Sequence, residues 1–143
     1  MMATGGKRMT RLEKEFYKSY QENGVEYRIK DGVKNFTDEW LKRPEDLDKL
    51  VKSDEYTIRA KVVDVGRDKD LDILVKDPSE YVRYAVAMNG RDKDLDRLVH
   101  DPDWEVRQAV AEQGREKDLD ILVGDPDQLV KAKAKSKMAQ IQR

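Results

Sequence analysis

Apolar positions recur along most of this chain at a fixed interval of 24 residues. Gly66, Gly90 and Gly114 each open a near copy of one phrase, namely GRDKDLDILVKDPSEYVRYAVAMN, GRDKDLDRLVHDPDWEVRQAVAEQ and GREKDLDILVGDPDQLVKAKAKSK. A weaker copy, KRPEDLDKLVKSDEYTIRAKVVDV, begins at Lys42. The three later copies align without gaps and match at most positions. The pattern therefore predicts four repeats, at residues 42–65, 66–89, 90–113 and 114–137.

The spacing of apolar residues inside each repeat predicts two helices. Leu95, Leu98 and Val99 lie at i, i+3 and i+4, which places them on one face of a short helix. Val106 begins the same spacing on a second helix, where it is continued by Ala109 and Val110. The apolar columns are Leu47, Leu71, Leu95 and Leu119; Leu50, Leu74, Leu98 and Leu122; Val51, Val75, Val99 and Val123; and Ile58, Val82, Val106 and Val130. One such hairpin cannot bury its apolar face alone, so neighbouring repeats must stack into a solenoid.

Helix boundaries are predicted from the residues between the two apolar stripes. Aspartate is a good N-cap and proline suits the first helical position, so each Asp-Pro pair is expected to start the second helix. These pairs are Asp77-Pro78, Asp101-Pro102 and Asp125-Pro126. Glu80 lies three residues after Asp77, the spacing of a capping box. Gly90 and Gly114 fall where the second helix should stop. Each unit is thus expected to contain a short helix or 3₁₀ turn, a tight corner and a helix of about ten to twelve residues.

These residues resemble the HEAT-like repeat family, and the short period resembles its leucine-rich repeat variant. The resemblance is carried by Asp-Pro-x-x-x-Val-Arg followed by Ala-Val-Ala, and by aspartate and arginine six apart, as in Asp101 and Arg107. It covers residues 42–137 and implies a right-handed superhelix of alternating α and 3₁₀ helices that binds other macromolecules. The iron–sulfur cluster of some repeat-variant proteins needs N-terminal cysteines, which this chain lacks.

The N-terminal 41 residues fall outside the repeats. Residues 1–8 are expected to be disordered, and residues 9–22 to form a helix after Thr10 with Leu12, Phe16 and Tyr20 on one face. Alternating Val25, Tyr27 and Ile29, followed by Asp31-Gly32, predict a small β-hairpin, and Thr37 a short helix carrying Trp40 and Leu41. We expect residues 9–41 to cap a repeat domain at 42–143. The alternative is that the aromatic set Phe16, Tyr17, Tyr20, Tyr27, Phe36 and Trp40 docks a partner.

Composition narrows the class of protein. The 143 residues include 41% charged residues and 38% hydrophobic residues, with a net charge of −1. Such a balance favours an extended shape or a partly solvated chain over a compact globule, and gives no global attraction to nucleic acid or membrane. The fold class predicted from the repeat pattern is all-α. The absence of cysteine excludes disulfides, thiolate catalysis and thiolate metal sites. No apolar run approaches the ~20 residues of a membrane span, and no signal peptide is recognised. We therefore expect a soluble, cytoplasmic protein.

No catalytic or metal site is predicted, although two features deserve a test. The D-x-D pairs Asp70/Asp72, Asp94/Asp96 and Asp118/Asp120 could suggest metal ligands, but their recurrence in each repeat points to helix N-terminal charges or ladder partners. His100, the single histidine, shares its column with Lys52, Lys76 and Gly124, which is typical of a solvated position. Nucleophile, metalloprotease and phosphate-loop motifs are missing. The chain is therefore not expected to be an enzyme or to need a cofactor.

Two basic columns run through the repeats. We expect the first, Arg59, Arg83, Arg107 and Lys131, to form an inter-repeat ladder with the Asp-Pro aspartates. The second consists of Arg43, Arg67, Arg91 and Arg115, with Lys69, Lys93 and Lys117 beside it. Such a stripe could track phosphates, which makes nucleic-acid binding the alternative function. Its cations are interleaved with the D-x-D carboxylates, which should cancel much of its field.

Aromatic residues supply the candidate protein-binding site. Trp104 shares a column with Tyr56, Glu80 and Gln128, and a column that accepts Glu and Gln cannot be core. Trp104 should therefore be at least half exposed, as should Tyr81 and Tyr84 in neighbouring columns. Exposed Trp and Tyr are enriched at binding hot spots, so these four aromatic residues predict a non-enzymatic protein–protein interaction module: an adaptor, inhibitor or small scaffold. The alternative is that Trp104 only packs over a neighbouring repeat.

Overall fold

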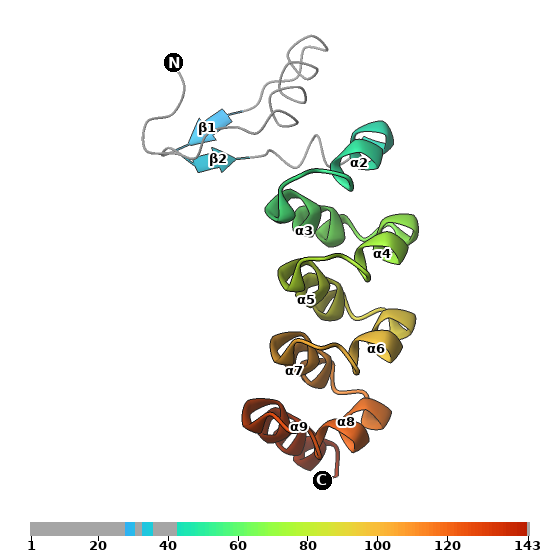
Figure 1. Cartoon of the computed structure of the whole chain (residues 1–143), viewed down its shortest axis with the longest axis vertical. Coiled ribbons are helices and arrows are strands. Elements are labelled where there is room, and N and C mark those ends of the chain that lie inside the picture. Colours follow the sequence, from blue (N-terminus) through green and yellow to red (C-terminus); the bar gives the residue numbers. More distant parts are fainter. Residues whose placement is uncertain (1–27, 31–32, 36–42, 143) are drawn as a thin grey trace. The chain divides into compact units, whose positions relative to one another are not determined.

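The computed structural model describes residues 28–30, 33–35 and 43–142 (Figure 1). They divide between two compact units, residues 1–65 and 66–143. The described helices agree with the all-α class, and none of them is long and apolar enough to cross a membrane. The predictions for residues 1–8, for the helix at 9–22 and for the Thr37–Leu41 segment lie outside the described residues.

The first unit contains two strands and two helices. Strand β1 (Arg28–Lys30) pairs antiparallel with β2 (Val33–Asn35), in the segment where the alternating pattern predicted a hairpin. The predicted capping role of this hairpin is not supported by the contacts of the described residues. Helices α2 (Pro44–Leu50) and α3 (Tyr56–Val65) follow and pack on one another. Leu47, Leu50 and Ile58 are buried there, as the apolar columns predicted.

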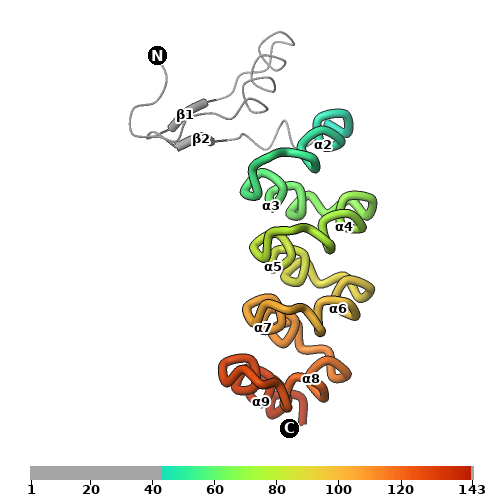
Figure 2. Tube along the Cα trace, in the orientation of Figure 1, coloured from blue at the N-terminus to red at the C-terminus, as the bar shows by residue number. Residues whose placement is uncertain are grey.

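The second unit alternates short and long helices. The short ones are α4 (Asp68–Leu74), α6 (Asp92–Leu98) and α8 (Glu116–Leu122), and the long ones are α5 (Glu80–Asn89), α7 (Trp104–Gln113) and α9 (Gln128–Ile141). Figures 1 and 2 show the long helices in one row and the short helices in a second row beside it. Helix α7 packs on both α5 and α9, and each short helix packs on the long helix that follows it.

The core lies between these two rows and matches the predicted columns. Leu95 and Leu98 on α6 are buried against Val106 and Val110 on α7, and the equivalent residues of the other pairs are buried as well. Val123, directly after α8 in the last pair of helices, is the exception and is partly exposed. Burial of each Leu or Val side chain contributes about 1.5–3 kcal/mol to folding, so the columns carry most of the stability of this unit.

The predicted starts of the long helices were wrong by two residues. The N-caps are Ser79, Asp103 and Asp127, so the helices begin after the Asp-Pro pairs. The Asp103 carboxylate accepts the N–H groups of Glu105 at 2.9 Å and Val106 at 3.3 Å. Asp101 instead accepts the N–H of Asp103 at 2.9 Å, and Asp77 and Asp125 do the same in their own repeats, so these aspartates close a turn before the helix. Prolines 78, 102 and 126 therefore lie in the corner, and Glu80 is the first helical residue, too early for a capping box.

The helix ends agree better with the prediction. Gly90 (φ 84°) and Gly114 (φ 76°) adopt the left-handed conformation at the ends of α5 and α7, where glycine is favoured because it lacks a Cβ. Helix α9 has no such glycine and continues to Ile141. The short helices differ from the 3₁₀ helices that the family resemblance implied. They are α-helical over seven residues, with i to i−3 hydrogen bonds at both ends: the N–H of Asp94 bonds to the Arg91 carbonyl and the N–H of Asp101 to the Leu98 carbonyl, each at 3.0 Å.

Candidate functional site

A ladder of buried ion pairs joins the corners of successive repeats in the second unit. Arg83 donates from Nε to Oδ2 of Asp101 at 2.8 Å and from Nη1 to the Asp77 carbonyl at 2.7 Å. Arg107 repeats both contacts with Asp125 and with the Asp101 carbonyl, each at 2.8 Å. The hydrogen bonds that these arginines donate to Asp101 and Asp125 raise the pKa of Arg83 and of Arg107 above the ordinary value. The predicted inter-repeat ladder is thus confirmed for these two arginines. Their positive charges are paired with aspartates inside the fold.

A second ladder explains the D-x-D pairs. Arg115 donates from Nε to the buried Asp118 of its own repeat at 2.7 Å, and from Nη2 to Asp96 of the preceding repeat at 2.7 Å. Arg91 makes the same contacts with Asp94 at 2.8 Å and with Asp72 at 2.7 Å. The first aspartate of these pairs is therefore a buried partner and the second, in Asp72 and Asp96, an exposed one, which agrees with the second of the two predicted roles, that of ladder partners.

Lysines complete this second ladder. Lys93 lies 2.6 Å from Asp72, and Lys117 lies 2.7 Å from Asp96. Hydrogen bonds from the lysine and then from the arginine hold the pKa of Asp72 and of Asp96 below its ordinary value. The exposed carboxylates of Asp72 and Asp96 are thus each shared by two cations of the next repeat. Within the described ranges, no group of three or more His, Asp or Glu residues is placed to hold a metal ion.

The residues of the alternative nucleic-acid stripe therefore lie among carboxylates. Besides Arg91 and Arg115, Arg67 is 2.7 Å from the buried Asp70. Arg43 lies 3.1 Å from Glu45 and 3.4 Å from Asp46 in the first unit. Lys69 is exposed on α4. These carboxylates neutralise much of the positive charge with which the stripe would have to bind a phosphate backbone.

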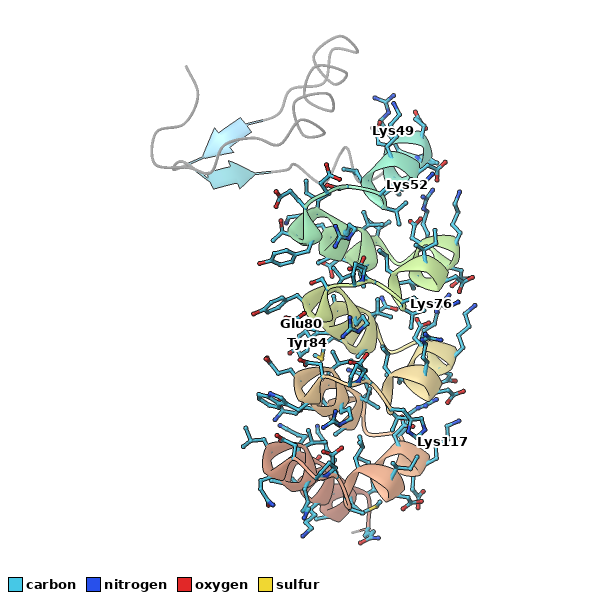
Figure 3. The ribbon with its side chains drawn as sticks, in the orientation of Figure 1. Lys49, Lys52, Lys76, Glu80, Tyr84 and Lys117 are labelled. Atoms are coloured by element: carbon cyan, nitrogen blue, oxygen red, sulfur yellow. The ribbon has the colours of Figure 1, made fainter. Side chains whose placement is uncertain are left out.

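The aromatic candidates of the second unit lie on the long helices. On α5, Tyr81 is 56% exposed and Tyr84 is 41% exposed, while Trp104 at the start of α7 is half-buried. Figure 3 shows Tyr84 and Glu80 on the long-helix side, and Lys76 and Lys117 on the short-helix side. Tyr56, the first residue of α3 in the other unit, is 42% exposed. The predicted exposure is confirmed for Tyr81 and Tyr84, whereas Trp104 is less exposed than predicted.

Further exposed apolar residues of the second unit were missed from the sequence, namely Met88, Leu129 and Ile141 on the long helices and Ile73 and Ile121 on the short ones. Met88 lies four residues after Tyr84 on α5 and is 42% exposed, so it continues the stripe of Tyr81 and Tyr84 along one helix face. Leu129 on α9 is 56% exposed. The i+4 spacing from Tyr84 could have revealed Met88, whereas Leu129 occupies the column of Tyr81 and Glu105. The exposed apolar surface is therefore larger than the aromatic residues alone suggest.

A cleft opens between the corner that joins α4 to α5 and the corner that joins α6 to α7. Its volume is about 420 Å³, and Val75, Pro78 and Pro102 form apolar parts of its wall. Lys76, Arg97 and His100 contribute cationic or titratable side chains, beside the Arg83–Asp101 pair. His100 is exposed, as predicted for a solvated column. Sequence reasoning missed the cleft, although Arg97 departs from the isoleucines at the equivalent positions 73 and 121.

Comparison with known proteins provides no relative from which a function could be transferred. No protein-family model, curated protein or solved structure matches the chain. A function must therefore be inferred from the exposure, charge and packing of the described side chains. The exposed apolar stripe and the cationic cleft are the two features of the second unit that the repeat architecture does not require.

Proposed function

We propose that this chain is a non-enzymatic protein–protein interaction module, acting as an adaptor, inhibitor or small scaffold. Its architecture would be a right-handed α-solenoid of four 24-residue HEAT-like repeats. Support comes from the four copies in the sequence and from the two charge ladders that recur at the same interval. A cytoplasmic location is part of the proposal, because a chain without cysteine needs no oxidising compartment.

The partner is proposed to bind the aromatic surface, defined here as Tyr81, Tyr84, Met88 and Trp104. The observation that carries this proposal is the row of three large exposed side chains at i, i+3 and i+7 on α5. In the next repeat the same positions hold Glu105, Gln108 and Glu112, so the fold does not need apolar residues there. Tyrosine, tryptophan and methionine are typical of the anchors that carry binding energy. Tyr56 is a further candidate from the first unit.

The repeat itself supplies variants that test this surface without harming the fold. Trp104→Glu copies Glu80, and Tyr84→Gln copies Gln108 of the neighbouring repeat. Each should keep the helical circular dichroism and the urea midpoint of the wild type, yet abolish capture of a partner from an extract of the source cell. Ile73→Arg, which copies Arg97 at an exposed site on a short helix, is the matched control and should retain the partner.

Binding must then be reproduced with the captured protein in purified form. Equal affinity of the wild type and Trp104→Glu for that protein would reject the aromatic surface. A large loss of stability in Trp104→Glu would instead assign Trp104 to packing.

The alternative, nucleic-acid binding through the second basic column, is disfavoured by the pairing of Arg91 and Arg115 with carboxylates. A protein that neutralises phosphates loses affinity steeply with salt. The proposal expects no measurable binding to random duplex DNA above ~100 mM salt. Tight, salt-dependent binding that is lost in Arg91→Ala would favour the alternative.

A further inference from the structure

The cleft between the two corners is lined by three cationic side chains, Lys76, Arg83 and Arg97, and by two carboxylates, Asp77 and Asp101. Lys76, Arg97 and His100 are exposed at the cleft, and no ion pair of these side chains is found among residues 43–142. The carboxylates of the cleft are already occupied. Asp101 binds Arg83 and the N–H of Asp103, and Asp77 accepts the N–H of Ser79 at 2.9 Å. No carboxylate among residues 43–142 forms an ion pair with Lys76 or Arg97, so both side chains are available to an anionic ligand.

The repeat shows that this charge is not a requirement of the fold. One repeat further on, the positions of Arg97 and His100 are taken by Ile121 and Gly124. The corner there keeps the same turn and the same ladder, with Arg107 on Asp125 at 2.8 Å. An exposed arginine and histidine at one corner, absent from the next, are consequently free to serve a ligand.

The geometry points to a binding site for an acidic segment of a protein partner, with carboxylate side chains taken up by Lys76, Arg97 and His100. Arginine binds carboxylates in a planar, bidentate geometry that lysine supports as a point charge. The volume of about 420 Å³ equals that of roughly fourteen waters, which is too large for one small anion and suits several peptide residues. The apolar walls Pro78 and Pro102 would contact the methylene groups and backbone of such a segment.

The position of the cleft connects it to the aromatic surface. Pro78 precedes Tyr81 by three residues and Pro102 precedes Trp104 by two, so the cleft lies next to the first turns of α5 and α7, where Tyr81 and Trp104 of the aromatic surface also lie. The inference rests on the proposed function in assigning the anionic groups to a protein. A partner segment with acidic residues followed by apolar ones would fit both sites at once.

Binding of a fluorescein-labelled oligoglutamate peptide to the full chain, followed by fluorescence polarisation at low salt, tests this site. Arg97→Ile combined with His100→Gly copies the neighbouring corner and should weaken binding at least about tenfold, as expected for lost charge-assisted hydrogen bonds. Arg97→Gln alone should weaken it in the same direction. Lys135→Gln removes an equal charge from an exposed site on α9 and should change the affinity by less than about twofold.

The reciprocal change provides a gain of function. Gly124 is outside the left-handed region, and a Cβ there would meet only the Ile121 carbonyl, at 3.7 Å, so it tolerates a side chain. Ile121→Arg with Gly124→His should therefore create a second peptide site and raise the stoichiometry.

Equal peptide affinity of the wild type and the Arg97→Ile, His100→Gly variant would overturn the inference. Stronger binding of heparin or oligo-thymidine through the same residues would also overturn it, because the cleft would then recognise sulfate or phosphate. Failure of this site is distinguishable from failure of the proposed function. If oligoglutamate does not bind while Trp104→Glu still abolishes partner binding, only the cleft is rejected.

Discussion

At the scale of single residues, the two aspartates of the Asp101-Pro102-Asp103 corner have different roles. Asp101 closes a turn and binds Arg83 of the preceding repeat, whereas Asp103 caps α7. Both are good capping residues, and the apolar stripe that starts at Val106 fits either start of the helix. The sequence pattern alone therefore could not decide between them. The choice depends on Arg83 of the preceding repeat, which binds the Asp101 carboxylate and so holds it in the corner rather than at the helix start.

Because their roles differ, replacing Asp101 or Asp103 by alanine should lower the free energy of unfolding by different amounts. Asp103→Ala removes a cap and should lower the free energy of unfolding by about 1 kcal/mol. Asp101→Ala leaves the largely buried Arg83 without its carboxylate, and should lower it by about 3 kcal/mol. Urea unfolding measures both. Equal losses would contradict the assignment of Asp101 to the ladder.

A second pair of residues separates backbone conformation from packing. Gly114 is left-handed (φ 76°) and a Cβ there would meet nothing within 4 Å. Gly114→Ala should therefore lower the free energy of unfolding by about 1 kcal/mol from backbone strain alone. Gly124→Ala, outside the left-handed region, should leave it unchanged or raise it by about 0.4–1 kcal/mol. A neutral Gly114→Ala in urea unfolding would show that the end of α7 does not need its left-handed turn.

At the scale of helices, α9 is joined to α7 by charge as well as by its apolar face. Lys133 occupies the position of Ala85 and Ala109 in the two preceding repeats. The structure gives it a partner: Glu112 on α7, at 2.9 Å from Lys133 and 3.2 Å from Lys137. The prediction of helix positions, core columns and glycine stops needed only local spacing, and it was largely confirmed. The Glu112 pairing and the cleft depend on which side chains of different helices lie close together. The spacing of residues along the sequence does not give this information.

The Glu112 contact predicts a pH dependence. Hydrogen bonds from Lys133 and then Lys137 hold the pKa of Glu112 below its ordinary value of 4.5. A carboxyl with a lowered pKa in the folded state stabilises the fold above its unfolded pKa, and the contribution is lost as the pH falls through the folded value. Glu112→Gln should thus lower the urea midpoint at pH 7, and match the wild type well below pH 4.5. Asp120→Asn, at an exposed site on α8, is the control and should show no such convergence. A deficit in Glu112→Gln that persists at low pH would assign its effect to packing.

At the scale of the whole molecule, the contacts of the second unit are almost entirely between neighbouring repeats. Both ladders reach one repeat along the chain, over 18 residues in Arg83–Asp101 and 19 in Arg91–Asp72. Stability in such an array is approximately a sum of terms for each repeat and each interface. A unit that makes the same ladder contacts on both sides can therefore be duplicated with both ladders complete.

Insertion of a second copy of residues 90–113 between Gln113 and Gly114 tests the proposed solenoid. In that chain Arg107 would bind the inserted copy of Asp101, and the arginine of the copy would bind Asp125. Because the insert adds a complete interface, the urea midpoint and the helical circular dichroism should both rise. An insert with the same residues in shuffled order should lower the midpoint or leave it unchanged. A fall in the midpoint with the faithful copy would contradict a solenoid built from interchangeable repeats, since each repeat would then depend on contacts beyond its neighbours.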